Sequence, residues 1–392
     1  MNFTVATRMN AFKESVFNEL SKYKKQLMAE GRDIVDLSVG SPDLPPPDYI
    51  IDELNSYVTM PTSYGYTLTA LEEFKEAVCT YYDNKYEVSI ELQEVLMLMG
   101  SQDGLVHLPM VFANPGDTIL VPDPGYTAYA TAVAMAGAEP YPMPLLEKNG
   151  FLPDLSMIPT DIADRAKMMI LNFPGNPIPA LASAEFFGEV IAFAKKHNII
   201  IIHDFAYSEL YYEKEKPISF LSIEGAKEVG VEFNSLSKSF NLAGCRIGYL
   251  VGNEKIIHSL NVLKGNLDYG VFLPVQKAAI AALTVETDFS NQLRAIYKKR
   301  RDKLVNGLNE LGWKVTSPSA SMFVWAKIPS GTTSTTFAYE LLDRAGVVVT
   351  PGNAFGESGE GYVRIALVQD EETLEKAIHK IESSGIFTSD GR

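Results

Sequence analysis

The sequence predicts an α/β fold whose mainly parallel sheet is covered by helices on both faces. First, short apolar segments alternate with segments of helical periodicity between residues 94 and 252, as strands and helices do in such folds. Second, the run from Ile199 to Ile202 is apolar without alternation, which is typical of a central parallel strand. Third, turns with polar residues follow the apolar segments, at the sheet edge where ligands bind.

The individual elements follow from periodicity and from turn residues. In the central part, strands are predicted at 94–99, 118–121, 167–171, 199–202, 229–233 and 249–252, and helices at about 71–82 and 184–197. Before it, a helix is expected from Phe12 to about residue 31 and a short strand at 34–39. After it, a polar helix is expected at 288–311, two short strands within 313–328, and further strands at 347–350 and 361–367.

Composition and charge exclude several classes of protein. The chain is 46% hydrophobic and has a net charge of −15, which argues against nucleic acid or an anionic membrane as a partner. Cys79 and Cys245 allow one disulfide at most, and they exclude a disulfide framework or a thiolate metal site, so no metal is expected. Neither a signal-type segment nor a run of eighteen apolar residues occurs, so a cytoplasmic protein is predicted.

The most informative stretch lies between the apolar segments 229–233 and 249–252. It contains Ser235, Ser237, Lys238 and Arg246 within twelve residues. A lysine with apolar neighbours at a strand exit can lose its proton and become a nucleophile. The hydroxyls and the arginine offer hydrogen bonds and positive charge to a phosphate. An amine beside a phosphate site is what pyridoxal 5'-phosphate requires.

This stretch has two other interpretations. Lys238 could be an ordinary exposed lysine in a loop, as most lysines are. Ser235 and Lys238 also match the S-x-x-K signature of penicillin-binding serine hydrolases. That family needs Lys-Thr-Gly and Ser-Asp-Asn elements as well, and neither occurs in this chain, which disfavours a hydrolase.

Other strand exits carry residues suited to a cofactor. Ser101 and Gln102 follow residues 94–99 and open a helix, and the N–H groups of such a junction attract phosphate. Tyr126 follows residues 118–121 and could lie against an aromatic ring or pack in the core. Asn176, in a proline-rich turn after residues 167–171, is a short polar donor.

The exit of the isoleucine run carries an aspartate and a tyrosine, Asp204 and Tyr207. A buried carboxylate needs a cationic partner, such as a protonated pyridine nitrogen. Asp204 could instead cap a helix.

Candidate substrate residues lie outside the central part or at its start. Gly40 follows the strand at 34–39 and would let a carboxylate approach the backbone, or it could be a plain turn glycine. Arg364 alternates with apolar neighbours and could hold a carboxylate bidentately or pair on the surface. Tyr64 and Tyr66 lie in an aromatic turn and could serve a partner subunit's site or simply pack.

Together these residues resemble the class I/II aminotransferases of the aspartate aminotransferase fold, which is pyridoxal-phosphate-dependent fold type I. The motif Ser235-x-Ser237-Lys238-x-x-x-x-x-Gly244-x-Arg246-x-Gly248 is the most specific match. The resemblance implies a three-layer sandwich with a mainly parallel central sheet and a smaller α+β domain formed from both termini. It further implies a small domain of residues 1–44 and 285–392, a large cofactor-binding domain of residues 45–284, and a homodimer with active sites at the subunit interface.

The resemblance also implies a role for each candidate residue. Lys238 is expected to be the Schiff-base lysine, with Asp204 on the pyridine nitrogen and Tyr126 stacked on the ring. The phosphate is expected on Ser235 and Arg246, with backbone help from Ser101 and Gln102, and Ser237 is expected to bind the cofactor as well. The ring hydroxyl is expected on Asn176 and Tyr207, and the substrate on Arg364, Gly40 and Asn176. Tyr64 or Tyr66 is expected to reach the cofactor or substrate of the neighbouring subunit.

Within the family, residues 217–233 and 266–272 are similar to LL-diaminopimelate aminotransferases. Ile178-Pro179, Cys245 and Ala70 depart from the usual family pattern, which leaves the side-chain pocket open. The expected activity is transfer of an amino group between an L-amino acid of the diaminopimelate, aspartate, glutamate or alanine class and a 2-oxo acid such as 2-oxoglutarate. The alternatives are a C–S lyase that uses the same cofactor and a regulator that binds it without turnover.

Overall fold

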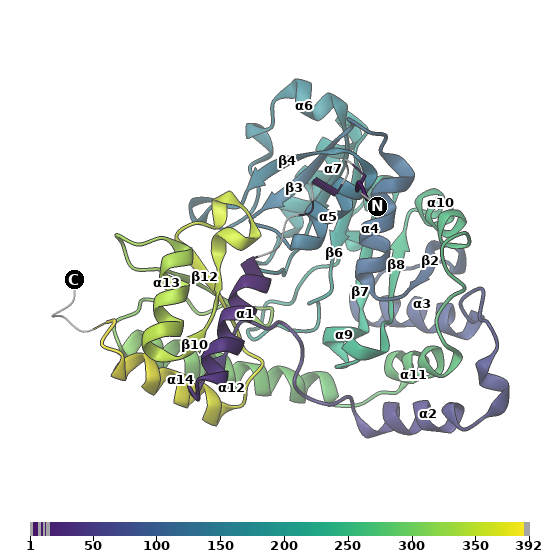
Figure 1. Cartoon of the computed structure of the whole chain (residues 1–392). Coiled ribbons are helices and arrows are strands. Elements are labelled where there is room, and N and C mark those ends of the chain that lie inside the picture. The colour runs from purple at the N-terminus through teal and green to yellow at the C-terminus, as the bar shows by residue number, and fades with distance from the viewer. Residues whose placement is uncertain (1–2, 7–8, 11, 13–15, 388–392) are drawn as a thin grey trace.

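The computed structural model describes residues 3–6, 9–10, 12 and 16–387. In Figure 1, a large twisted sheet with helices around it lies beside a smaller group of strands and helices from the C-terminal part of the chain. The N-terminal helix α1 (Val16–Ala29) packs against this smaller group. Among the described residues, no helix has the length and apolar character needed to cross a bilayer.

The large sheet has the strand order β2-β8-β7-β6-β5-β3-β4. Its strands are β2 (Val95–Leu98), β3 (Thr118–Asp123), β4 (Glu139–Pro144), β5 (Ala166–Leu171), β6 (Ile200–Asp204), β7 (Gly230–Ser235) and β8 (Gly248–Gly252). Neighbouring strands pair in parallel, except that β8 is antiparallel to both β7 and β2. This order confirms the mainly parallel sheet that the sequence predicts.

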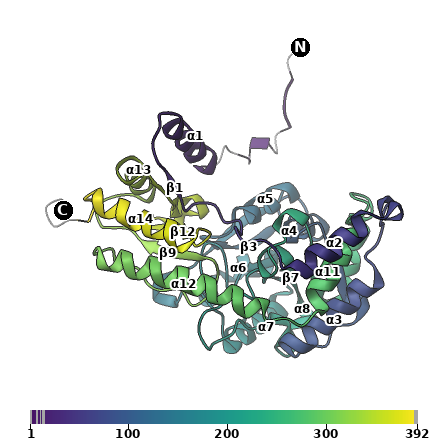
Figure 2. The same cartoon turned by 90° about the horizontal axis from the view of Figure 1, so that it is seen from below.

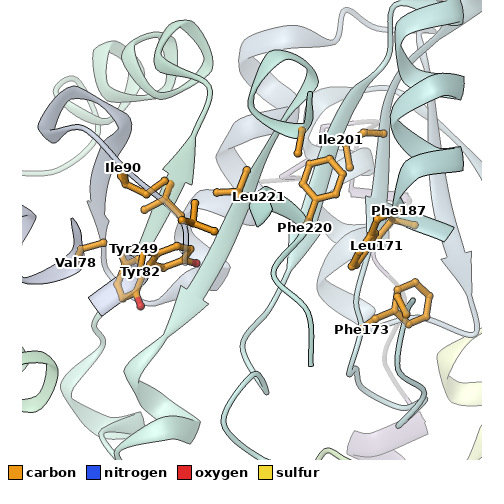
Figure 3. Packing of buried hydrophobic residues seen from close by; sticks show 14 of the residues in the cluster. Val78, Tyr82, Ile90, Leu171, Phe173, Phe187, Ile201, Phe220, Leu221 and Tyr249 are labelled. Atoms are coloured by element: carbon orange, nitrogen blue, oxygen red, sulfur yellow. The ribbon is translucent and has the colours of Figure 1, made fainter. Parts of the chain in front are cut away.

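Alternate residues of the strands enter two separate cores. On one face, Ile201 belongs to a cluster with Tyr82 and Phe187 (Figure 3). On the other face, Ile202 belongs to a cluster with Tyr129. The first core is bounded by α3 (Glu72–Tyr86), α7 (Ala184–His197) and α11 (Leu273–Thr284), and the second by α4 (Ser101–Phe112), α5 (Thr127–Ala136) and α10 (Glu254–Lys264). Helices therefore cover both faces, as the continuous apolar run of β6 requires.

The smaller group contains two short sheets and has its own core. The antiparallel order β11-β12-β9 and the parallel pair β1-β10 make up its sheets. Their bounds are β1 (Val35–Asp36), β9 (Phe323–Lys327), β10 (Val347–Val348), β11 (Thr350–Pro351) and β12 (Tyr362–Ala366). Leu304, Phe337 and Leu374 are fully buried in this core. The predicted division into residues 1–44 with 285–392 and residues 45–284 stays a prediction.

The remaining helices pack around these two cores. Figure 2 shows α12 (Phe289–Glu310) and α14 (Glu371–Ser383) side by side along the smaller group, with α2 (Asp48–Val58) against α11 at the other end. The shorter helices are α6 (Thr160–Arg165), α8 (Ala226–Val229), α9 (Leu236–Ser239) and α13 (Ser334–Glu340). The polar helix predicted at 288–311 is thus confirmed as α12.

Three of the segments that differ from the sequence prediction are residues 139–144, residues 313–328 and the start of the N-terminal helix. The edge strand β4 was not expected, because it contains three prolines at alternate positions. The N–H groups of Glu139 and Leu145 point toward β3, so the prolines face away from it and no ladder bond is lost. Within 313–328, only one of the two expected strands forms. The helix predicted from Phe12 begins at Val16, and residues 13–15 lie outside the described part.

Candidate active site

A cavity of about 330 Å³ lies beyond the carboxyl ends of the parallel strands and extends to the smaller group. Twelve of the fourteen candidate residues line it: Gly40, Ser101, Gln102, Tyr126, Asn176, Asp204, Tyr207, Ser235, Ser237, Lys238, Arg246 and Arg364. The structure therefore brings together residues from both parts of the fold. Thr127, Asn172, Ala206, Ala243 and Phe355 also line the cavity and were not singled out from sequence.

Lys238 lies on the one-turn helix α9, which follows β7 directly. The hydroxyl of Ser235 caps this helix by accepting from the Ser237 N–H at 3.2 Å. The Lys238 Nζ donates to the carbonyl oxygen of Gly40 at 2.6 Å. Burial, with smaller contributions from the charges of Arg364 and Arg246, lowers the pKa of the Lys238 amine to about 8. About a tenth of this amine is therefore uncharged at pH 7, far more than for a solvated lysine, and able to act as a nucleophile or base.

Asp204 ends β6 and is 4% exposed. Its Oδ2 accepts from the Tyr129 hydroxyl at 2.7 Å and its Oδ1 accepts from the Ala206 N–H at 3.3 Å. Burial raises the pKa of the Asp204 carboxyl, and these two hydrogen bonds oppose that rise. Tyr129 was missed by sequence reasoning, although its place one helical turn after Tyr126 puts both on the same side of α5.

Asn172 joins the exits of β5 and β6. Its Nδ2 donates to the backbone oxygen of Asp204 at 2.6 Å, and its Oδ1 accepts from the Asn176 N–H at 2.9 Å. The turn that carries Asn176 is thereby held against Asp204. Tyr207 is buried nearby, and burial raises the pKa of its phenol, so the hydroxyl stays protonated and able to donate.

The N-terminus of α4 forms another wall of the cavity. Its N-cap residue Gly100 has φ of 80° and makes no side-chain capping bond, so the first N–H groups of this twelve-residue helix remain for a ligand. A Cβ at Gly100 would come within 2.6 Å of the Arg246 guanidinium. Arg246 itself is exposed and donates to the Ala243 carbonyl at 3.0 Å. This end of the cavity is positive and suited to a phosphate.

Arg364 of β12 also lines the cavity and is 4% exposed. Its Nη1 donates to Asn176 Oδ1 at 2.7 Å, and its guanidinium faces the rings of Phe323 and Phe355. Burial lowers the pKa of Arg364 to about 10, so the group remains charged at neutral pH. Its Nε is buried without a partner, which indicates that a ligand acceptor is missing here.

Gly40 and Tyr126 fix two other walls. A Cβ at Gly40 would lie 2.8 Å from the Phe323 ring, so the chain passes too close for a side chain. Tyr126 is the N-cap residue of α5, donates to Gln102 Oε1 at 3.2 Å and meets the Tyr129 ring edge-on. Both residues line the cavity, and their predicted roles toward substrate and cofactor stay predictions.

Tyr64 and Tyr66 lie outside the cavity of this chain. Tyr64 is 63% exposed, donates to the Val58 carbonyl at 2.8 Å and contacts Phe272. Tyr66 is 81% exposed and contacts Tyr269. Their predicted role toward a neighbouring subunit stays a prediction.

The donors of the cavity fit a phosphorylated pyridine aldehyde. The uncapped α4 N-terminus and Arg246 suit the phosphate, and the Asp204 carboxylate suits a protonated ring nitrogen. The unpartnered Nε of Arg364 suits a substrate carboxylate. Lys238 supplies an amine in the same cavity. The site therefore has a matching group for each reactive part of pyridoxal phosphate and of an α-amino acid.

Comparisons with known proteins agree with this geometry. A family model described as aminotransferase class I and II matches residues 32–381. An LL-diaminopimelate aminotransferase from Halothermothrix orenii is 44% identical over 383 residues, covering 97% of this chain and 98% of that protein. The substrate-bound BacF structure from Bacillus subtilis superposes with a TM-score of 0.93 at 40% identity, covering 97% of this chain and 98% of that one. A double mutant of Thermus thermophilus aspartate aminotransferase gives a TM-score of 0.92 at 27% identity, covering 98% and 100% of the two chains.

Replacing Gly100 with alanine tests the phosphate end of the cavity. Alanine is strained at φ of 80° and its Cβ would displace the Arg246 guanidinium. We expect the apoprotein to bind pyridoxal phosphate roughly 10- to 100-fold more weakly, as for loss of a charged hydrogen bond. Equilibrium dialysis measures this affinity.

Gly116→Ala is the matched control. Gly116 has φ of 88° and open space around its Cβ position, so this change carries the same backbone strain without displacing Arg246. Equal losses of affinity in both variants would contradict the role given to the Gly100–Arg246 contact.

Proposed function

Since the chain belongs to the class I and II aminotransferase family and is a pyridoxal-phosphate-dependent aminotransferase, we propose that Lys238 is its covalent cofactor residue and its catalytic base. The enzyme moves an amino group between an amino acid and a 2-oxo acid. One observation carries the assignment of Lys238: its buried amine, with a pKa of about 8, shares one cavity with Asp204 and Arg364.

The chemistry divides between cofactor and chain. Pyridoxal phosphate, when bound, supplies an electron-accepting ring and the carbon that carries the amino group. The Lys238 Nζ, uncharged above its pKa of about 8, takes the proton from the substrate α-carbon and later returns it. The Gly40 carbonyl oxygen accepts a hydrogen bond from this amine and so holds the amine in place before the reaction.

The remaining candidate residues would hold cofactor and substrate in place. Asp204 would keep a proton on the ring nitrogen, since a buried carboxylate is stabilised by a cationic partner. Tyr126 would cover one face of the ring. The residues proposed to bind the cofactor phosphate are Ser101, Gln102, Ser235, Ser237 and Arg246. The residues proposed to hydrogen-bond the ring hydroxyl are Asn176 and Tyr207. Their common position on one cavity supports these roles.

We propose that Arg364 binds the substrate α-carboxylate. The Arg364→Ala enzyme should lose at least about 100-fold in kcat/KM, mainly through a raised KM, because charged hydrogen bonds are removed from a buried site. Arg364→Lys should recover part of this loss but not the bidentate geometry. Steady-state kinetics measures both variants, and an unchanged KM in Arg364→Ala would refute the role. The visible absorbance of the bound cofactor should persist in each.

We further propose an LL-diaminopimelate-class amino donor. The Halothermothrix orenii relative named above carries this activity in its name. A second hollow, of about 280 Å³, shares Gly40 and Arg364 with the cavity and extends along α1 to Ser21 and Lys24. Lys24 pairs there with Asp36 at 2.6 Å. A donor whose long side chain ends in its own charged groups would find room and polar partners in this hollow.

A panel of donors in stopped-flow half-reactions tests this specificity. LL-diaminopimelate should react with a kcat/KM about tenfold or more above that of aspartate, glutamate, alanine or methionine. Lys24→Ala should lower the value for diaminopimelate several-fold, as for a partly exposed charged contact, and leave alanine unaffected. A better reaction with a short donor, or equal losses for all donors, would contradict the proposed class. Release of ammonia and pyruvate without a 2-oxo acid would instead identify a lyase.

We also propose that the enzyme acts as a homodimer. The aromatic cluster of Tyr64, Tyr66, Tyr269 and Phe272 is 40–81% exposed on one chain. A contiguous exposed apolar patch of this kind marks an interface. Tyr64 or Tyr66 would reach the site of the other copy, whose Arg246 end is open.

Both cysteines are free, which supports the proposed cytoplasmic location.

Light scattering tests the dimer. The protein should have twice the mass of one 43.2 kDa chain, and Tyr269→Arg should shift it toward the monomer, because the added charge must be desolvated in the interface. Met157→Arg, at a 73% exposed position outside the aromatic cluster, should stay dimeric. A monomeric wild-type protein at micromolar concentration would refute the proposal.

A further inference from the structure

A fully buried polar cluster lies under the large sheet, on the face opposite Asp204. His203 and Glu232 occupy paired positions on β6 and β7 and are both 0% exposed. Because side chains alternate along a strand, His203 points away from the face that Asp204 occupies. Tyr82 of α3 and Ser219 complete the cluster and are at most 1% exposed. The roles proposed above use none of these four side chains.

The Glu232 carboxylate accepts four hydrogen bonds. Its Oε1 accepts from the hydroxyls of Tyr82 and Ser219, each at 2.8 Å. Its Oε2 accepts from the Phe220 N–H at 2.7 Å and lies 2.8 Å from His203 Nδ1. Burial raises the pKa of Tyr82, so its phenol stays a donor. Four donors therefore occupy the acceptor positions of one carboxylate.

Both ring nitrogens of His203 face acceptors. Nε2 lies 3.2 Å from the Phe173 carbonyl oxygen, which can only accept, so Nε2 carries a hydrogen. Nδ1 faces Glu232 Oε2, which also accepts from the Phe220 N–H, so this ring nitrogen faces an acceptor position too. This arrangement suits an imidazolium paired with a carboxylate. The ring centroids of Phe187 and Phe205 lie 5.1 and 5.0 Å from that of His203. These two rings exclude water from the pair of His203 and Glu232.

We propose that His203, held as an imidazolium by Glu232, is a positioning residue that keeps Asp204 ionised for the cofactor ring nitrogen. The proposal rests on the role of Asp204 given above. Burial raises the pKa of the Asp204 carboxyl, the hydrogen bonds from Tyr129 and Ala206 oppose that rise, and the charge of His203 adds to this opposition. The charged or titratable groups close to His203 are Glu232 from β7, Tyr82 beyond it from α3, and Asp204 next to it in β6.

The His203 ring links three neighbouring strands near their carboxyl ends. It contacts Phe173 at the exit of β5, belongs to β6 and pairs with Glu232 of β7. Those exits carry Asn176, Asp204 and Lys238 respectively. His203 thus supports, from below, the edge of the sheet that faces the cavity.

The Glu232→Gln variant tests the proposal. Glutamine keeps the volume and can donate to Nδ1, so His203 then needs only one ring hydrogen and loses its charge. In 15N-histidine NMR of the apoprotein at neutral pH, His203 should have two protonated nitrogens in the wild type and one in the variant. Loss of one signal in His203→Gln identifies it among the five histidines. The affinity for pyridoxal phosphate should fall about tenfold, equal to one pKa unit at Asp204.

Glu209→Gln is the matched control. Glu209 is a 2% exposed carboxylate that pairs with Lys85 and Arg294 instead. Loss of the Glu209 charge should change the affinity for pyridoxal phosphate by less than about twofold and leave the His203 NMR signals unchanged. An equal fall in both variants would make the effect one of general stability and would overturn the proposal.

The NMR result decides the charge of His203 independently of the cofactor. A wild-type His203 with one unprotonated nitrogen overturns the proposal, even if Glu232→Gln does not fold. Failure of the wild-type protein to bind pyridoxal phosphate would contradict the proposed function, whereas the NMR result would still stand.

Discussion

Removal of the Lys238 amine from water is the constraint on which the site depends. A solvated lysine stays protonated at neutral pH and can act neither as nucleophile nor as base. Burial in a cavity that also holds Arg364 lowers its pKa to about 8. The acceptor for this amine is the carbonyl of Gly40, 198 residues earlier in the chain. The reactive amine therefore exists only when the large sheet and the N-terminal segment are assembled.

The parallel sheet supplies the rest by bringing strand exits to one edge. Asp204 is the last residue of β6, and Lys238 lies on α9, the short helix that follows β7. Asn172 joins the exits of β5 and β6 through its side-chain amide. Because a slip of one residue would move every buried side chain to the wrong face, the apolar strands fix the register of these exits. The position of each polar group is thus set by the packing of the strands behind it.

Much of this site could be predicted from the sequence, since each strand exit is marked by local residues and parallel strands end at one edge. Tyr129 could not, because a tyrosine inside an apolar helix looks like a core residue until Asp204 is found beside it. His203 and Glu232 become neighbours only through the pairing of β6 with β7, which no local pattern contains. The proline-rich β4 escaped prediction because its edge position, which tolerates prolines, is a property of the whole sheet.

The most direct test of this account locates the covalent bond between cofactor and chain. Borohydride reduction of the loaded enzyme fixes pyridoxal phosphate to the amine that holds it, and peptide mass spectrometry then identifies that amine. The account predicts a single modified peptide that contains Lys238, and no modified peptide from the Lys238→Ala protein. Modification of another lysine, or of none, would contradict it.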